Sequence, residues 1–303
     1  MKKVLAIVGP TAVGKTSLSI KLAKKYNGEI ISGDSMQVYR HLDIGTAKIT
    51  PEEMQGVKHY LINVRNVNER FSVADFKQEA EALINNISSR DKLPIIVGGT
   101  GFYLQALLND LTLGGNDENH AELEKIRNKL NQQSDKELLN SLKAVDKNSF
   151  ETIDHKNRRR IIRALEVYYL TGNKFSDQVQ QSKRFNDYII GLNTQRSLLY
   201  QRINQRVDIM IKQGLINEAE WLFKQKDVQQ AQMGIGYREW PPYLANQADI
   251  NQVIDEIKKD SRHYAKRQLT WFRNKMDVHW YDILQNEAEI NQIENDINHW
   301  LGV

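Results

Sequence analysis

Short apolar runs alternate with amphipathic segments through roughly the first third of the 303-residue chain. Four of these runs predict strands: Val4–Val8, Gly28–Ser32, Tyr60–Val64 and Pro94–Val97. Between them, apolar residues at helical spacing predict helices at Ser17–Lys25 and from Ser72, a candidate N-cap, to about Ile87. Alternating strands and helices are typical of a three-layer α/β core with a parallel sheet, and we predict this fold class.

The pattern changes after residue 110. From Ala121 to about Gln181 the chain is polar, with helical spacing and no strand pattern, so we interpret 111–189 as an inserted all-helical domain. A strand pattern returns, and further elements follow: a strand at Asp187–Leu192, helices at Gln195–Gln213, Glu218–Phe223 and Ile250–Trp271, a strand at Val278–Tyr281, and a terminal helix. The sequence therefore predicts one α/β core made of residues 1–110 and 190–303.

The first predicted strand leads into a complete phosphate-loop motif, G-x-x-x-x-G-K-[ST]. The motif consists of Gly9, Pro10, Thr11, Ala12, Val13, Gly14, Lys15 and Thr16. Its glycines let backbone N–H groups turn toward an anion, Lys15 adds a positive charge, and the Thr16 hydroxyl suits a phosphate-bound Mg²⁺. We therefore expect these residues to bind a phosphate-containing ligand, with Mg²⁺ as cofactor and Thr16 as its protein ligand.

ATP or GTP is the usual ligand of this motif, but two features argue against nucleotide hydrolysis. In an enzyme that hydrolyses a nucleotide, a buried strand normally ends in an Asp that holds the water shell of Mg²⁺. Here the strand Pro94–Val97 is followed by Gly98-Gly99-Thr100 instead. Asn274–Asp277 matches the guanine-reading letters N-K-x-D, but it follows a helical, basic segment, and we interpret it as a chance match. A small-molecule or nucleoside kinase remains the alternative function.

Composition narrows the class of protein further. The chain is 40% hydrophobic and 26% charged and has no cysteine, which is typical of a soluble globular protein and excludes disulfides and thiolate metal sites. No apolar run is long enough to cross a bilayer, and no signal-peptide pattern is present. We expect a cytoplasmic protein without a membrane partner, and a monomer. The net charge of +4 says less than the distribution of the basic residues.

Basic residues are concentrated in two predicted helices. The first contains Lys156, Arg158, Arg159, Arg160 and Arg163, of which all but Arg158 fall close to one side. In the second, between residues 258 and 275, lysines and arginines alternate with His263, Tyr264, Trp271 and Phe272. Basic side chains neutralise phosphates and flat aromatic rings stack on unpaired bases, so both helices favour RNA binding over a merely solvated face. A non-catalytic RNA-binding module is a third possible function.

Several further motifs complete a recognisable set. They are Ser32–Tyr39, Asp43–Lys48, Val97–Tyr103, Arg160–Glu166, Gly234–Glu239 and Tyr264–Arg273. Together with the phosphate loop, these motifs and their order along the chain resemble those of the tRNA dimethylallyltransferases, also called tRNA isopentenyltransferases. The resemblance extends from the N-terminus to about Trp280. In one departure, His59-Tyr60 and Asn63 stand where that family often has a His-His pair and an acidic residue.

The resemblance implies a P-loop kinase-like fold and a prenyl transfer reaction. Dimethylallyl diphosphate would donate its dimethylallyl group to the exocyclic amine of the adenosine just 3′ of the anticodon. The substrates would be tRNAs that read codons beginning with U, bound through their anticodon stem-loop.

The reaction must position a poorly nucleophilic amine, remove its proton and neutralise the departing diphosphate. Asp34, at a predicted strand end, is the candidate general base, with a Mg²⁺-shell or N-cap carboxylate as the alternative. Thr100 could donate to the bridging oxygen, or it could only cap the next helix. Lys15 and Arg206 would neutralise the leaving group.

The resemblance also implies which residues contact tRNA. Asp34, Ser35, Met36 and Gln37 would read the extruded adenine. A further glycine-rich turn would also contact tRNA, through Met233, Gly234, Ile235, Gly236, Tyr237 and Arg238. The helical insertion and the 258–273 helix would hold the anticodon stem-loop from either side.

Overall fold

A computed structural model of the chain describes residues 1–111, 120–177, 183–228 and 230–303. The chain divides into two compact units, Met1–Leu108 with Arg184–Val303, and Asn109–Lys183. The predicted insertion, 111–189, is too long at its C-terminal end. Residues 185–189 belong to the sheet, because strand β5 (Phe185–Leu192) pairs with β1 (Lys2–Val8) from its first residue. The predicted helical stretch at 178–181 lies outside the described residues.

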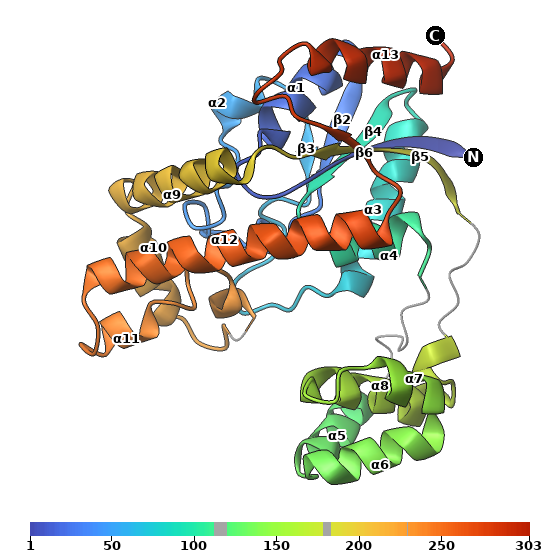
Figure 1. The fold of residues 1–303 in the computed structure, drawn as a ribbon, viewed down its shortest axis with the longest axis vertical. Coiled ribbons are helices and arrows are strands. Elements are labelled where there is room, and N and C mark those ends of the chain that lie inside the picture. The colour runs from blue at the N-terminus through green and yellow to red at the C-terminus, as the bar shows by residue number, and fades with distance from the viewer. Residues whose placement is uncertain (112–119, 178–182, 229) are drawn as a thin grey trace. The chain divides into compact units, whose positions relative to one another are not determined.

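The first unit is built on a parallel sheet (Figure 1). Its described strands lie in the order β3-β2-β4-β1-β5-β6. The other strands are β2 (Gly28–Ser32), β3 (His59–Tyr60), β4 (Leu93–Gly98) and β6 (His279–Tyr281). Because β1 lies between β4 and β5, the loop that follows β1 emerges at the carboxyl edge of the sheet, beside the ends of its neighbours. Ligands of open parallel sheets bind at this edge.

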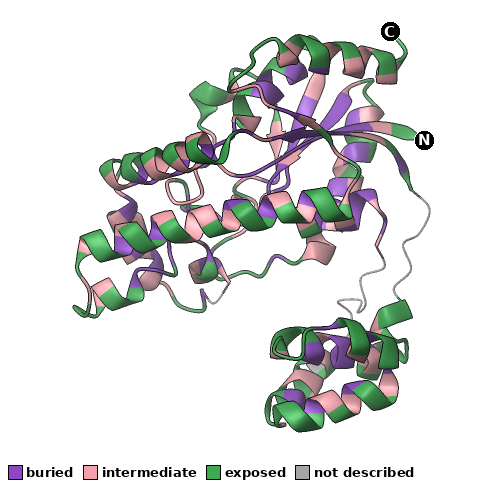
Figure 2. Ribbon diagram, in the orientation of Figure 1, coloured by how far each residue is buried: buried purple, intermediate pink, exposed green. Residues whose placement is uncertain are grey.

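Helices cover both faces of the sheet, so the predicted three-layer core is confirmed. Val4, Ala6 and Val8 face a core formed with α3 (Val73–Ser88), α4 (Gly101–Leu108) and α12 (Ile250–Lys275). Leu5 and Ile7 face the opposite core, formed with α1 (Lys15–Lys25) and α13 (Glu289–Leu301). Figure 2 shows that the strands between these layers are buried.

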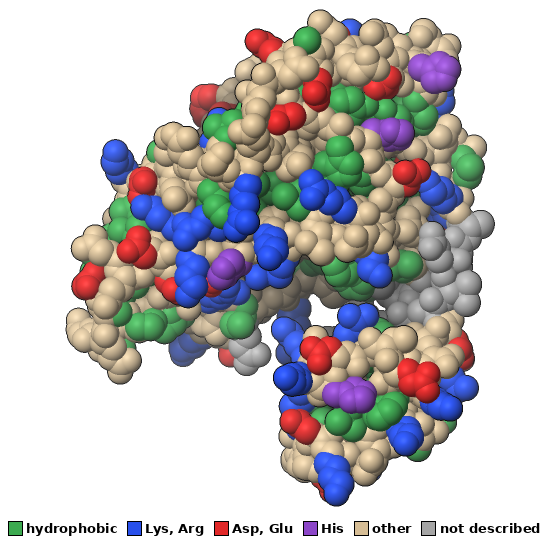
Figure 3. All heavy atoms as spheres, viewed as in Figure 1, with side chains coloured by type: hydrophobic (Ala, Val, Ile, Leu, Met, Phe, Trp, Pro, Cys, Tyr) green, Lys and Arg blue, Asp and Glu red, His purple; other side chains and the backbone are tan. Residues whose placement is uncertain are grey.

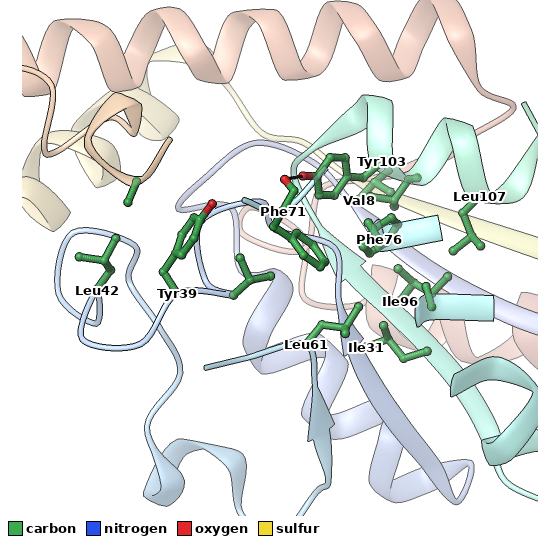
Figure 4. Close-up of a cluster of buried hydrophobic side chains, with 14 of the residues drawn as sticks. Val8, Ile31, Tyr39, Leu42, Leu61, Phe71, Phe76, Ile96, Tyr103 and Leu107 are labelled. Carbon is green, nitrogen blue, oxygen red and sulfur yellow. Dashed lines mark hydrogen bonds between the residues drawn. The ribbon is translucent and has the colours of Figure 1, made fainter. Parts of the chain in front are cut away.

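The first of these cores extends beyond the sheet edge (Figure 4). Tyr39 and Leu42 pack there with Phe71, and the Tyr103 hydroxyl donates to the Phe71 carbonyl at 3.1 Å. The remaining elements of this unit are α2 (Pro51–Met54), α9 (Arg196–Lys212), α10 (Leu215–Phe223), the 3-10 turn η3 (Ala231–Met233) and α11 (Pro241–Leu244). Helix α12 continues to Lys275, so the first two letters of the N-K-x-D match are helical.

The strand predicted at Tyr60–Val64 is wrong in its extent. Only His59 and Tyr60 pair with β2, because Leu61 and Asn63 have φ values of 59° and 56°, which end the ladder. The chain then turns toward the segment after β2, where Asn63 and Val64 donate their N–H groups to Gln37 and Val38. This departure from the strand braces the segment that carries the candidate base-reading residues.

The second unit is formed by short helices around its own core. They are α5 (His120–Asn131), α6 (Asp135–Val145), α7 (Lys147–Thr152), α8 (Arg158–Thr171) and the 3-10 turn η2 (Phe175–Asp177). Leu138, Leu142 and Leu165 are fully buried in that core. Among the helices that the structure describes, none is both long enough and apolar enough to cross a membrane.

Candidate active site

The phosphate loop, Gly9–Thr16, joins the central strand β1 to helix α1. Gly9 and Gly14 have φ values of 140° and 101°, and a Cβ on Gly9 would lie 2.4 Å from the Leu192 carbonyl oxygen. Residues with a side chain rarely adopt this backbone conformation, and at Gly9 there is no room for a Cβ atom. The turn directs the N-terminus of α1 toward a pocket, and free N–H groups at a helix N-terminus bind anions.

Lys15 folds back over the phosphate loop. Its Nζ donates to the carbonyl oxygens of Gly9 and Pro10, at 2.9 and 2.6 Å. Burial lowers the pKa of Lys15 to about 7, with a further decrease from the charge of Arg206 and an opposing effect of Asp34. A bound anion would reverse this change, because it favours the protonated ammonium.

Two arginines of α9 reach the same loop. Arg206 donates to the Thr11 hydroxyl at 3.2 Å, and the Arg202 Nε donates to the Ala12 carbonyl at 2.8 Å. Burial, together with the charge of Arg202, lowers the pKa of Arg206. The predicted Arg206 therefore lies at the phosphate loop, and the equally close Arg202 was missed by the sequence analysis. Arg202 precedes Arg206 by one helical turn, and this spacing was the available signal.

The loop fits a magnesium ion that arrives with a phosphate ligand. Thr16 lines the pocket with an exposed side chain, and hydroxyl and phosphate oxygens are ligands that Mg²⁺ prefers. Within the described parts of the chain, no three His, Asp or Glu side chains gather into a metal site. With Thr16 as its protein ligand, a magnesium ion here would be held mainly by the phosphate oxygens of the bound substrate and by water.

Gln268 of α12 ties the phosphate loop to the second glycine turn, Gly98–Gly101. Its buried amide accepts from the Thr11 N–H at 3.1 Å and donates to the Gly99 carbonyl at 3.0 Å. A Cβ on Gly99 would lie 2.0 Å from the Gln268 Nε2, so only glycine allows this approach. Sequence analysis included Gln268 in a motif but gave it no role.

Asp34 begins the segment after β2 and lines the pocket with Ser35, Met36 and Gln37. Its Oδ1 accepts from the N–H groups of Met36 and Gln37, at 2.8 and 3.3 Å. The carboxylate thus fixes its own turn, as an Asx turn does. The alternative of a helix N-cap fails for Asp34, because the helix assigned next along the chain, α2, is capped by Thr50.

Thr100 lies one contact away from the pocket. Its Oγ1 accepts from the Ser35 N–H at 3.2 Å and lies 3.5 Å from the Ser35 Oγ. Among the described residues that line the pocket, Ser35 is present and Thr100 is not. The residue immediately precedes α4, so its hydroxyl holds the Asp34–Gln37 segment to the start of that helix.

Three loop segments meet on one side of the pocket and form what we call the loop wall: Ser35–Gln37, Gly45–Ala47 and Met233–Arg238. The Gln37 amide donates to the Thr46 carbonyl at 3.3 Å, and a Cβ on Gly234 would lie 2.5 Å from the Met36 Cε. Met233 is 61% exposed. The wall thus presents both apolar and polar atoms.

One predicted tRNA contact in the loop wall needs correction. The Tyr237 side chain is fully buried, and its hydroxyl donates to Glu218 at 2.7 Å. It packs against Gly45, where a Cβ would lie 2.6 Å from the tyrosine ring. Tyr237 therefore supports the wall from inside the protein and does not offer its side chain to a ligand.

The basic residues of α8 belong to the second unit. Lys156 precedes the helix, which begins at Arg158, so the predicted common helical face loses one member. Arg159 and Arg160 are exposed, as is Lys156. Arg158 pairs with Asp135, and Arg163 with the buried Glu166. The first pair joins α8 to α6 and the second lies within α8, so part of this positive charge is neutralised inside the unit.

A second basic surface belongs to α12. Figure 3 shows Lys and Arg side chains gathered along the face that this helix crosses. Lys258 pairs with Asp208 and Lys259 with Glu256, whereas Lys266 and Arg267 are exposed. Tyr264 and Arg267 from this helix also line the pocket. Burial raises the pKa of Tyr264 to about 12, so its hydroxyl stays protonated near neutrality.

The pocket has a volume of about 1060 Å³ and brings most of these groups together. The phosphate loop, Arg206, Asp34 and the loop wall all line it. A cavity of this size, with an anion site and a carboxylate, defines a phosphate-loop α/β enzyme rather than a binding module.

Comparison with known proteins identifies the particular family. Residues 37–275 match the family model described as IPP transferase. The tRNA dimethylallyltransferase of Pediococcus pentosaceus is 62% identical, over 100% of this chain and 98% of that protein. The protein of the same name from Limosilactobacillus reuteri strain DSM 20016 is 53% identical, over 99% of both.

Solved structures agree with this result. The tRNA isopentenylpyrophosphate transferase of Bacillus halodurans is 44% identical with a TM-score of 0.76, over 100% of this chain and 97% of that one. A eukaryotic dimethylallyltransferase acting on tRNA is 30% identical with a TM-score of 0.83, over 97% of this chain and 78% of that one. The chain belongs to the IPP transferase family, which confirms the family, the fold class and the enzyme class predicted from the sequence.

Proposed function

We propose that this chain transfers a dimethylallyl group from dimethylallyl diphosphate to the exocyclic amine of the adenosine 3′ of the anticodon. Its substrates would be tRNAs that read codons beginning with U, and it would act in the cytoplasm, where such tRNAs are used. Relatives named tRNA dimethylallyltransferase support the donor and the acceptor. The proposal is carried by one observation: the phosphate loop and the Asp34–Gln37 segment line the same pocket.

In the proposed reaction the adenosine amine attacks the allylic carbon while the bond from that carbon to the diphosphate oxygen breaks. The amine loses one proton, and we assign that proton to Asp34. Because the amine lone pair is delocalised into the ring, proton removal and alignment carry much of the catalysis. The N–H groups of Met36 and Gln37 hold one carboxylate oxygen, which leaves the other as the proposed acceptor.

The diphosphate leaves toward positive charge. Lys15, Arg206 and the N–H groups of the phosphate loop are the proposed partners, since each lies at or on that loop. Mg²⁺, held through Thr16, would supply further positive charge to the diphosphate when bound. We propose that Thr100 acts through Ser35, because the Thr100 hydroxyl accepts a hydrogen bond from the Ser35 N–H. Direct donation by Thr100 to the bridging oxygen stays a prediction.

The acceptor base must leave its stack to reach this pocket, at a cost of a few kcal/mol that pocket contacts offset. We propose that Ser35–Gln37, Met233 and Arg238 contact that base. The second unit, which makes up most of the predicted insertion, is proposed to bind the anticodon stem-loop through the exposed Lys156, Arg159 and Arg160. The exposed Lys266 and Arg267 of α12 would contribute similarly.

A double-label experiment tests the function directly. The protein is incubated with bulk tRNA and either allyl-labelled dimethylallyl diphosphate or γ-labelled ATP, and the tRNA is digested to nucleosides. We expect the allyl label in a modified adenosine and no transfer of the γ-phosphate. Label movement from ATP to a small acceptor would instead establish the kinase alternative.

A further inference from the structure

Glu218 of α10 occupies an anion-binding turn made by the protein itself. Its Oε2 accepts from the N–H groups of Asp43 and Ile44, at 2.8 and 2.9 Å, and its Oε1 accepts from the Gly45 N–H at 2.8 Å. Three successive N–H groups that converge in this way form a nest, a backbone arrangement selective for anions. Hydrogen bonds to an ionised carboxylate are about twice as strong as neutral ones.

The same carboxylate also binds a second segment of the loop wall. The Tyr237 hydroxyl donates to Oε1 at 2.7 Å, and Tyr237 is fully buried against Gly45. Glu218 therefore receives four hydrogen bonds from two segments that are far apart in sequence. Among the described residues that line the pocket, Glu218 itself does not occur.

The position of this turn determines the position of Gln37, which lines the pocket. Next to Gly45, the Thr46 carbonyl accepts from the Gln37 amide, and the Gln37 Oε1 accepts from the Ser32 hydroxyl at 3.1 Å. At its other end the turn is held by buried Lys48, which donates to the Tyr39 carbonyl and to Asp43 and Asn63. A shift of the nest would therefore move Gln37, which is one of the proposed base contacts.

We propose that Glu218 is a positioning residue that sets the loop wall for the acceptor base without touching it. This inference rests on the proposed function, because it assigns the loop wall to the acceptor and the phosphate loop to the donor. Glu218 acts through the Asp43–Gly45 turn on Gln37, and through Tyr237 on Met233–Arg238. Removal of its charge lowers kcat/KM for tRNA and leaves the binding of dimethylallyl diphosphate intact.

The test uses Glu218→Gln, which keeps the size of the side chain. One amide oxygen cannot serve four donors, and the new NH₂ group faces N–H groups. Displacing a contact by about 1 Å costs about 100-fold in catalysis, so we expect kcat/KM for tRNA to fall by about 10- to 100-fold, through a lower kcat and, because base contacts are weakened, a higher KM. The Kd of dimethylallyl diphosphate, measured by calorimetry, should change by less than about twofold because the sites are separate.

Glu220→Gln is the matched control. It makes the same chemical change two residues further along α10, which turns the side chain by about 200° away from the nest. Wild-type kinetics are expected for this variant. Tyr237→Phe is the second variant, for the case that Glu218→Gln does not fold. It removes one of the four donors and should raise KM for tRNA by about threefold to tenfold, the equivalent of one hydrogen bond.

Amide hydrogen exchange separates this inference from the proposed function, because it needs no substrate. In the wild type the N–H groups of Asp43, Ile44 and Gly45 should be protected, and Glu218→Gln should expose all three. Equal losses of donor and tRNA binding, or unchanged exchange at these amides, would overturn the positioning role. If the wild type transfers no prenyl group but exchange behaves as expected, the proposed function fails together with the assignment of the loop wall to the acceptor base, whereas the control of the Asp43–Gly45 turn by Glu218 stands.

Discussion

The two sides of the pocket are built by different means. On the phosphate loop, Lys15 finds its partners five and six residues away, at Pro10 and Gly9. In the loop wall, the partner of Gly45 is Glu218, 173 residues along the chain. A local motif therefore forms the anion site on the side proposed for the donor, and α9 and α12 add distant contacts to it, whereas tertiary contacts hold together the side proposed for the acceptor. Mutations on the two sides should accordingly separate donor binding from tRNA use.

The largest effect is expected where the two sides meet, at Asp34. Asp34→Asn keeps an oxygen that can accept from Met36 and Gln37 but removes the proposed base, so kcat should fall by about 10²- to 10⁴-fold. KM for tRNA should remain nearly unchanged in steady-state assays. Asp34→Ala, which also removes the turn, should raise KM as well. Near-normal turnover by Asp34→Asn would exclude Asp34 as the base.

Lys15→Met tests the phosphate side alone. Loss of a charged hydrogen-bond donor costs about 1.5–3 kcal/mol, so the Kd of dimethylallyl diphosphate should rise by about 10- to 100-fold. Binding of a tRNA stem-loop, followed by fluorescence anisotropy, should be unaffected. Lys25→Met, on the same helix but paired with Glu294, is the control. A parallel loss of tRNA binding would show that the two sides are not independent.

The pH dependence of donor binding should follow Lys15. Its pKa in the free protein is lowered to about 7, and a bound diphosphate raises it, so affinity falls as pH increases above 7. The decrease approaches about tenfold per pH unit. At pH 8 the diphosphate is already ionised, since phosphate titrates near about 6, and binding should take up close to one proton. Calorimetry in two buffers measures this uptake, which Lys15→Met should abolish.

The smallest effect is expected for Gln268→Leu. The substitution leaves the part-buried Thr11 N–H and the buried Gly99 carbonyl without this partner, which should lower the free energy of unfolding by about 1–3 kcal/mol. Donor affinity should fall by only about threefold, because α1 and Lys15 still form the anion site. Chemical denaturation and calorimetry measure the two quantities. A donor affinity as weak as that of Lys15→Met would mean that the phosphate loop is not a local structure.

Sequence analysis succeeded where local chemistry decides the structure. The phosphate loop, β2 and the start of α12 follow from spacing, glycines and capping residues within a few positions. It was less successful where distant contacts decide: the strand expected at Tyr60–Val64 is broken by Leu61 and Asn63 in left-handed conformations, and Tyr237 is buried beneath the wall. A single sequence contains no sign that Glu218 and Gly45 meet.

Gln268 has a consequence for the synthesis of the protein. Its bond to Thr11 joins residues 257 positions apart, although the phosphate loop itself is complete after the first sixteen residues. At about 5–20 residues per second, a ribosome needs about 13–50 s to cover that interval. During this time the nascent loop lacks the α12 contact that holds it to the second glycine turn. The phosphate loop therefore gains this brace late in synthesis, after the whole of the second unit, Asn109–Lys183, has been made.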